Sequence, residues 1–256
     1  MAPCILFCFA HPDDESFCGV GTALKYRARG VRSVLVTATR GERGKCGEPA
    51  VCTPDELPAM RERELREAAA IGGIDEVHVL DYRDRELSST PPDEIRAVLV
   101  SHIRRVRPLV VVTFDPNGFN QHPDHVAIGR FASDAVAAAA DPRWLRDAGE
   151  PHAVPRLLWT PPLPPWEAGR TADVHDRPGV DFAIDCGEWR EQKAAALRAH
   201  RTQHLSIDKY FFDQPQRERI LSLEIWRHGG GPPLGRRPVP DLLAGLDREA
   251  GDDERS

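Results

Sequence analysis

Hydrophobic residues gather in short continuous runs along the first half of the chain, and segments of mixed character separate these runs. The runs cover 3–10, 31–37 and 109–114, with a shorter expected strand at 76–80. Continuous apolar runs of this length are typical of strands that are buried on both faces of a sheet. Helices are expected between them, at 17–29, 57–71, 92–106 and 125–140. This alternation predicts an α/β fold with a Rossmann-like, mostly parallel sheet and helices on both faces.

The second half of the chain is less regular. Strands are expected at 157–160 and 182–185, on either side of a proline-rich connection at 161–165, and helices at 188–204 and 214–227. From residue 229 onward the chain is dominated by Gly, Pro and charged residues, which favour a flexible segment. The predicted organisation is therefore a single domain over residues 1–228, followed by a flexible tail at 229–256.

Length and charge exclude several classes of protein. At 256 residues with 41% hydrophobic content, the chain can bury a sizeable core. The formal net charge is −6 and no basic stripe is visible, so a nucleic-acid partner is not expected. No apolar window reaches the roughly 18 residues of a membrane span, and the residues after Met1 lack the pattern of a secretory signal. The expected location is the cytoplasm.

Two smaller features leave alternatives open. Cys46 and Cys52 flank an irregular loop and could form a disulfide or hold a metal, although reduced thiols are expected in a cytoplasmic protein. His200 and His204 lie four residues apart on a predicted helix and could form a second metal site. A role in packing or in a substrate loop is the simpler interpretation of this pair.

The segments His11–Glu15 and His122–His125 carry the candidate chemistry. Each contains His-Pro-Asp and follows a run of apolar and β-branched residues, so each is expected where a buried strand ends. Folds of this class build their sites at the carboxyl ends of strands. Both segments are also compatible with ordinary helix starts, because Asp is a favoured N-cap and Pro fits the first turn. The presence of both in adjacent parts of one sheet favours a metal centre.

The residue types suggest one ligand set. A catalytic zinc site has three protein ligands and an open position for water. Side chains of neighbours in a turn point apart, so one of Asp13 and Asp14 can bind the metal while the other faces the water. His11, Asp14 and His125 make a set of two imidazoles and one carboxylate, which leaves His122 to reach over the substrate. Zn2+ is the expected ion, and Fe2+ is compatible with the same set.

The motifs together resemble a known family. Ala10–Glu15 (AHPDDE) after the first apolar strand, then Asp115–Gly118 (DPNG) and His122–His125 (HPDH), is similar to the LmbE-like or PIG-L family of zinc-dependent N-deacetylases. That family includes deacetylases of N-acetylglucosaminyl-phosphatidylinositol, of mycothiol and bacillithiol precursors, and of some antibiotic intermediates. Supporting matches extend the resemblance over about residues 3–205, at Thr39–Glu42, Arg61-x-x-Glu64 and Lys193 with His200–Gln203.

The resemblance implies an activity and the residues that perform it. The expected enzyme is a metal-dependent hydrolase that removes an N-acetyl or other acyl group from a small molecule containing an amino sugar. His11, Asp14 and His125 would be the metal ligands. Asp13 would be the general base that takes a proton from zinc-bound water, and His122 would stabilise the oxyanion and protonate the leaving amine.

The resemblance also implies roles for neighbouring residues. Asp124 would orient and tune His122, and Arg61 and Asp84 would contact sugar hydroxyls. One position departs from the pattern, because relatives of the mycothiol type carry Tyr two residues before the first histidine of HPDH, where this chain has Asn120. A contact from that tyrosine to the transition state is therefore absent or replaced by an amide.

Three other functions remain as alternatives. An amidase that cleaves a larger acyl group from a glucosaminyl thiol conjugate would use the same residues. A phosphoesterase usually needs two metals about 4 Å apart, and the sequence offers no clear second ligand set. A non-catalytic metal- or sugar-binding protein would need neither Asp13 nor His122, so the presence of both argues against it.

Overall fold

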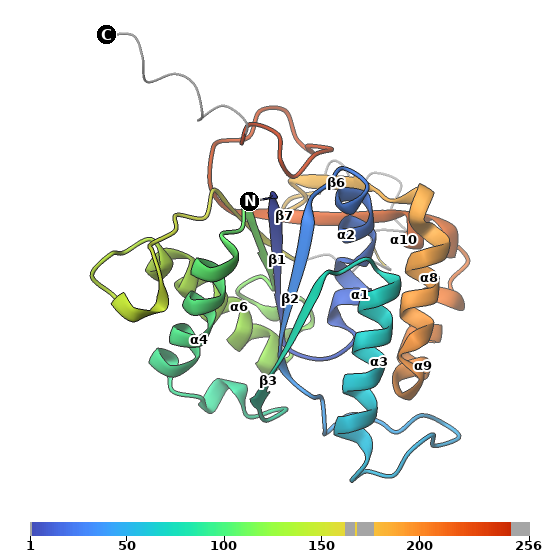
Figure 1. The fold of residues 1–256 in the computed structure, drawn as a ribbon. Helices are drawn as coiled ribbons and strands as arrows, with labels where there is room; N and C mark the ends of the chain where they lie inside the picture. The colour runs from blue at the N-terminus through green and yellow to red at the C-terminus, as the bar shows by residue number, and fades with distance from the viewer. Residues whose placement is uncertain (1, 162–166, 168–176, 247–256) are drawn as a thin grey trace, which may run out of the picture.

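Strands from both halves of the chain form one sheet in the computed structural model, which describes residues 2–161, 167 and 177–246 (Figure 1). The strands in this part of the chain are β1 Cys4–Phe9, β2 Arg32–Thr39, β3 Glu76–Tyr82, β4 Val110–Thr113, β5 Arg156–Trp159, β6 Phe182–Asp185 and β7 Leu223–Gly230. Their order is β3-β2-β1-β4-β5-β7-β6. The first five in this order are parallel, and β7 runs antiparallel to both β5 and β6. The predicted α/β fold with a mostly parallel sheet is confirmed.

Helices cover both faces of this sheet. They include α1 Asp14–Cys18, α2 Val20–Arg27, α3 Leu57–Ile71, α4 Pro92–Val106, α6 Pro123–Ala139 and α8 Arg190–Ala199. In Figure 1, α4 and α6 lie on one side of the sheet, whereas α1, α2, α3 and α8 lie on the other. Short helices complete the described chain: α5 Gly118–Gln121, α9 His204–Ile207, α10 Arg217–Ser222 and a π-helical turn at Asp208–Phe212. The expected bounds of α3 and α4 agree with the structure.

The first strand lies at the centre of the hydrophobic core. Every residue of β1 is buried, as its continuous apolar run predicts. The rings of Phe9 and Phe114 pack edge to face with centroids 5.2 Å apart, which joins β1 to the end of β4. This packing fixes the ends of two neighbouring strands relative to each other.

The helix expected at 17–29 is present as α1 and α2, which meet at Gly19. A Cβ atom at Gly19 would lie 2.8 Å from the ring of Phe7, so only glycine allows this approach to the sheet. The first helix also begins earlier than expected, at Asp14. The first His-Pro-Asp segment therefore forms a tight turn between β1 and α1.

The two motifs meet where the strand order reverses. From β1 the chain continues outward to β2 and β3, and it then returns to place β4 on the other side of β1. Such a reversal opens a crevice at the carboxyl ends of the two central strands. His11 follows β1 and His122 follows β4, so both lie at this crevice.

Two helix predictions in the second half need correction. The helix expected at 188–204 ends at Ala199, and the chain turns at His200. The helix expected at 214–227 is wrong beyond Ser222, because Leu223–Gly230 forms β7 between β5 and β6. Pairing on both edges outweighs the local helical pattern of this segment. Residues 162–165 of the proline-rich connection lie outside the described residues.

The segment expected as a flexible tail from residue 229 contacts the rest of the domain over its described part. Gly229 and Gly230 belong to β7, and Val239 pairs with Phe182. Leu242 is fully buried, and its carbonyl accepts a hydrogen bond from the Arg156 guanidinium. A few apolar residues thus anchor a segment that is otherwise rich in Gly and Pro, and residues 247–256 lie outside the described residues. No helix in the described chain is long and apolar enough to cross a membrane.

Candidate metal centre and active site

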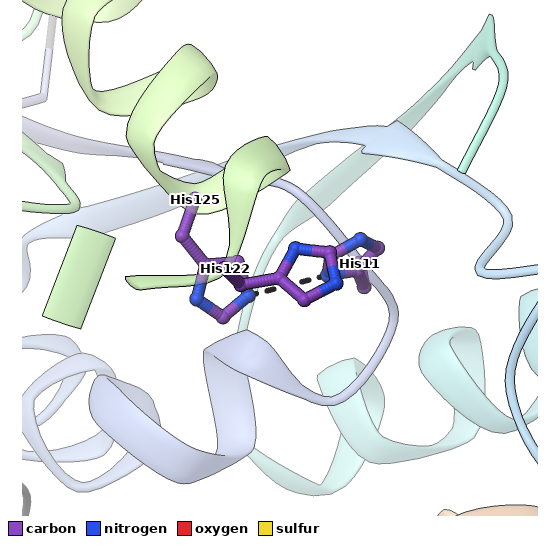
Figure 2. A group of neighbouring side chains, drawn as sticks. All are labelled: His11, His122 and His125. Atoms are coloured by element: carbon purple, nitrogen blue, oxygen red, sulfur yellow. Dashed lines mark hydrogen bonds between the residues drawn. The ribbon is translucent and has the colours of Figure 1, made fainter. Parts of the chain in front are cut away.

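A cavity of about 260 Å³ opens over the crevice between β1 and β4. Both His-Pro-Asp segments line it, and Figure 2 shows the rings of His11, His122 and His125 gathered together. His11 leaves the end of β1, whereas His122 is the N-cap residue of α6 and His125 lies in the first turn of that helix. The fold therefore brings together side chains that are more than 100 residues apart.

His11, Asp14 and His125 point their donor atoms at one another. The His11 Nδ1 and His125 Nε2 atoms lie 3.2 Å apart (Figure 2). The Asp14 carboxylate lies 3.3 Å from His125 Nε2 through Oδ1 and 3.7 Å from His11 Nδ1 through Oδ2. Three atoms bound to zinc at tetrahedral angles lie about 3.4 Å apart, since each bond is about 2.0–2.1 Å long. This set has the spacing and the chemistry of a metal site.

The other nitrogen of His11 faces two carboxylates. Its Nε2 lies 3.2 Å from Asp84 Oδ1 and 3.2 Å from Asp124 Oδ2. Burial lowers the pKa of His11, but its hydrogen bonds with Asp124 and Asp84 outweigh burial and raise the pKa to about 10. The Nε2–H of His11 can donate to these carboxylates, which leaves Nδ1 facing Asp14 and His125. Carboxylates fix metal-binding histidines in this way in many proteins.

Two other groups of side chains in the described chain could hold an ion, His11 with His122 and His125 (Figure 2), and His11 with Asp84 and Asp124. Backbone groups already occupy these carboxylates. The Asp124 oxygens accept from the amides of Arg85 and Leu87, and Asp84 Oδ2 accepts from the amide of Arg43. The two aspartates therefore anchor His11 to neighbouring loops, and the opposite side of its ring faces Asp14 and His125.

Asp13 lies between the ligand set and an arginine. Its Oδ2 atom is 3.3 Å from Arg61 Nη2, and both residues line the cavity. Burial raises the pKa of Asp13 to about 6, although the Arg61 charge opposes this rise. A carboxyl group with a pKa near neutrality can both accept and release a proton at physiological pH.

His122 lines the same cavity from the start of α6. Its ring packs edge to face with the His11 ring, with centroids 4.8 Å apart. His122 Nδ1 accepts a hydrogen bond from the Asp124 backbone amide at 3.2 Å. In the neutral ring the proton then lies on Nε2. Burial lowers the pKa of His122, and the neighbouring His11 and His125 lower it further.

The contacts of Asp124, Arg61 and Asp84 in the structure differ from the expected ones. The Asp124 carboxylate contacts His11 and not His122, which receives only the backbone amide of Asp124. Arg61 donates to the carbonyls of Gly41 and Pro12, and Asp84 contacts His11. Arg61 and Asp84 line the cavity, but their described contacts support the two motifs.

The Oδ1 of Asn120, the residue in place of tyrosine, accepts from the His122 amide.

The remaining candidates lie away from the ligand set. Cys46 and Cys52 are not joined by a disulfide among the described residues. His200 Nε2 contacts Glu15, whereas His204 Nε2 accepts from the amide of Glu48, so the two rings do not share a site.

Sequence reasoning missed Tyr210, which lines the cavity from the π-helical turn. No motif surrounds this tyrosine, so no local pattern indicated that it lines the cavity.

Comparisons with known proteins identify the family of the chain. Residues 6–136 match the family PIG-L: GlcNAc-PI de-N-acetylase. The chain is 36% identical to a 1D-myo-inositol 2-acetamido-2-deoxy-alpha-D-glucopyranoside deacetylase of Streptomyces griseus, over 94% of this chain and 88% of that protein. It is 40% identical to a probable N-acetyl-alpha-D-glucosaminyl L-malate deacetylase 2 of Bacillus anthracis, over 52% of this chain and 59% of that protein.

A solved structure shares the fold. The N,N'-diacetylchitobiose deacetylase from Pyrococcus horikoshii superposes with a TM-score of 0.69 at 24% identity, and the match covers 89% of this chain and 84% of that chain. Both His-Pro-Asp motifs lie inside the residues that match the family. The chain therefore belongs to the PIG-L (GlcNAc-PI de-N-acetylase) family.

Proposed function

We propose that this chain is a metal-dependent N-deacetylase that releases acetate from an N-acetylglucosamine-containing small molecule. The observation that carries the proposal is the close approach of His11, Asp14 and His125 at a cavity that Asp13 and His122 also line. The relatives from Streptomyces and Bacillus carry names with different aglycones, inositol and malate, but the same acetylated glucosamine. The acetylated sugar is therefore the part of the substrate that we assign to this cavity.

His11, Asp14 and His125 would hold the ion, which we propose to be Zn2+. A divalent ion in this position lowers the pKa of a water and polarises an amide carbonyl. The chain's own contribution is to fix three ligands and leave the cavity side open. The buried hydrogen bonds that His11 Nε2 donates to Asp84 and Asp124 keep its Nδ1 directed at that position.

Asp13 would accept the proton of the attacking water. It lies next to Asp14 and lines the cavity, so its carboxylate is within reach of a nucleophile beside the ion. Arg61 holds the carboxylate in place through a contact of 3.3 Å. General-base catalysis of this kind contributes about 10²–10⁴-fold to the rate.

His122 would act on the other side of the amide. Its Nδ1 accepts from the Asp124 amide, so Nε2 carries the proton and can donate to a developing oxyanion. The leaving nitrogen would take the proton that Asp13 accepted from the water, because a neutral His122 ring has no second proton to release, and the products would be a neutral amine and acetate. We further propose that Arg61 and Asp84 contact sugar hydroxyls at the edge of the same cavity.

The test is amine release from a panel of N-acetylglucosamine derivatives. The protein is stripped with a chelator and reloaded with Zn2+ or with Fe2+, and the panel includes an inositol glycoside, a malate glycoside and an analogue with a longer acyl group. We expect amine release that disappears on chelation and returns with the metal. Release only from the longer acyl group would replace this proposal with an amidase. Silence across the panel with metal bound would contradict it.

A further inference from the structure

The backbone of Asp13 has a conformation that an aspartate rarely adopts. Its φ is 112° and its ψ is −28°, outside the region that L-residues favour. Asp13 is also the N-cap residue of α1, and a rotation to the negative φ of a helical residue would let the helix begin one residue earlier. Strained residues of this kind persist only where surrounding contacts hold them. The contacts that hold Asp13 therefore decide where its carboxylate points.

The side chain of Glu15 holds the Asp13 backbone. Its Oε2 atom accepts the Asp13 amide hydrogen at 3.0 Å. Its Oε1 atom accepts from the Ser16 hydroxyl at 2.6 Å and contacts His200 Nε2 at 2.8 Å. Glu15 is 1% exposed and His200 is fully buried. A carboxylate buried this deeply keeps its place only if its oxygens are hydrogen-bonded.

Distant parts of the chain set the position of His200. It follows the last residue of α8, and its ring reaches Glu15 across 185 residues of sequence. The next turn is fixed by Glu64 of α3, which accepts from the Thr202 amide at 3.0 Å and from its hydroxyl at 2.6 Å. The imidazole is therefore held by α3 and α8, not by the motif that it supports.

We propose that Glu15 and His200 form a positioning pair that holds Asp13 in its strained conformation, with its carboxylate over the substrate. This inference rests on the role proposed above for Asp13. The pair touches neither the ligand set nor the sugar. If the pair is broken, Asp13 relaxes into α1 and its carboxylate moves away from the reacting water, while His11, Asp14 and His125 stay in place. A displacement of about 1 Å can reduce a rate about 10²-fold.

The test compares His200→Ala with His200→Gln. The glutamine amide can still donate to Glu15, whereas alanine leaves the carboxylate without this partner. Glu15→Gln is a second variant that keeps the shape of the side chain and removes its charge. Glu224→Gln is the matched control, because Glu224 is an equally buried carboxylate that accepts from the Gly21 and Thr22 amides but does not reach Asp13.

Each variant is measured for kcat, KM, bound metal, thermal stability and exchange of the Asp13 amide hydrogen by NMR. We expect His200→Ala to lower kcat about 10²-fold with little change in KM or in metal content. We expect His200→Gln to recover part of this loss, and Glu224→Gln to lose stability while it keeps kcat. The Asp13 amide should exchange faster in His200→Ala than in the wild-type protein, because its acceptor has lost support.

Two results would overturn the positioning pair. One is a kcat for His200→Ala that falls no further than that of Glu224→Gln at equal stability. The other is a loss of activity that follows a loss of metal, which would make His200 a general structural support. The amide exchange does not depend on turnover. If the wild-type enzyme failed to release amine, the proposed function would fall while the exchange rates still reported whether the pair holds Asp13.

Discussion

The two His-Pro-Asp segments share three letters, yet the fold holds them in different ways. In the first, His11 ends a buried strand, and its ring is fixed from both sides by Asp84, Asp124 and His125. In the second, His122 caps the start of α6, and its half-buried ring accepts one hydrogen bond, from the Asp124 amide. The first histidine is locked in place, whereas the second keeps one nitrogen free for the cavity.

This difference shows that the role of a short motif depends on the strand end or helix start at which it lies. A turn that leaves a buried strand surrounds its side chains with protein, which suits a residue that must hold an ion. A helix N-terminus leaves its cap residue at the edge of the cavity, which suits a residue that must meet a substrate. Asp124 connects the two tasks, because its amide binds His122 and its carboxylate binds His11.

The largest effect on kcat is expected from Asp13, which precedes the proposed ligand Asp14 in the first segment. Asp13→Ala should lower kcat by about 10²–10⁴-fold, because the attacking water loses its base. The variant should keep its metal, since Asp13 is not in the ligand triangle. Steady-state kinetics together with metal analysis check both statements. Metal loss from this variant would show that Asp13 and Asp14 have exchanged roles.

A smaller effect is expected from the second segment. His122→Ala should lower kcat by about 10²–10³-fold, the usual cost of removing a donor to an oxyanion. KM and metal content should change little, because His122 holds neither the ion nor the sugar in this account. His125→Ala is the matched variant, and it should lose the metal itself. If both variants lost the metal equally, the two histidines of this segment would not have separate tasks.

The smallest effect is expected from the residue that joins the two segments. Asp124→Asn keeps an oxygen for the backbone amides but removes the charge that faces His11. Metal affinity should fall about 10–100-fold, as is usual when a partner of a ligating histidine is lost. Competition with a chelating dye measures this change. An unchanged affinity, with a lower kcat, would return Asp124 to the role expected from the sequence, as a partner of His122.

Much of the fold could be predicted because local pattern and environment agree. Continuous apolar runs predicted the central strands, and the helices at 57–71 and 92–106 have their expected bounds. The prediction failed where tertiary contacts outweigh local pattern. Leu223–Gly230 becomes a strand because two sheet edges are available, and the segment near Leu242 is ordered because Arg156 binds its carbonyl.

The candidate site was likewise predictable only in part. Spacing within each motif, together with a family resemblance, predicted the residues that line the cavity. It could not predict that the Asp124 carboxylate turns toward His11, because that contact joins positions 113 residues apart. The contact between Glu15 and His200 was hidden for the same reason. Such contacts depend on how α6 and α8 pack, which no local pattern encodes.

The most direct test of this account is a crystal structure of the protein loaded with Zn2+, with the ion located by anomalous scattering. The account predicts an ion bound by His11 Nδ1, Asp14 and His125 Nε2 at about 2.0–2.2 Å, with its open side toward Asp13 and His122. An ion bound instead by His11 Nε2 with Asp84 and Asp124, or one that takes His122 as a ligand in place of Asp14, would contradict it.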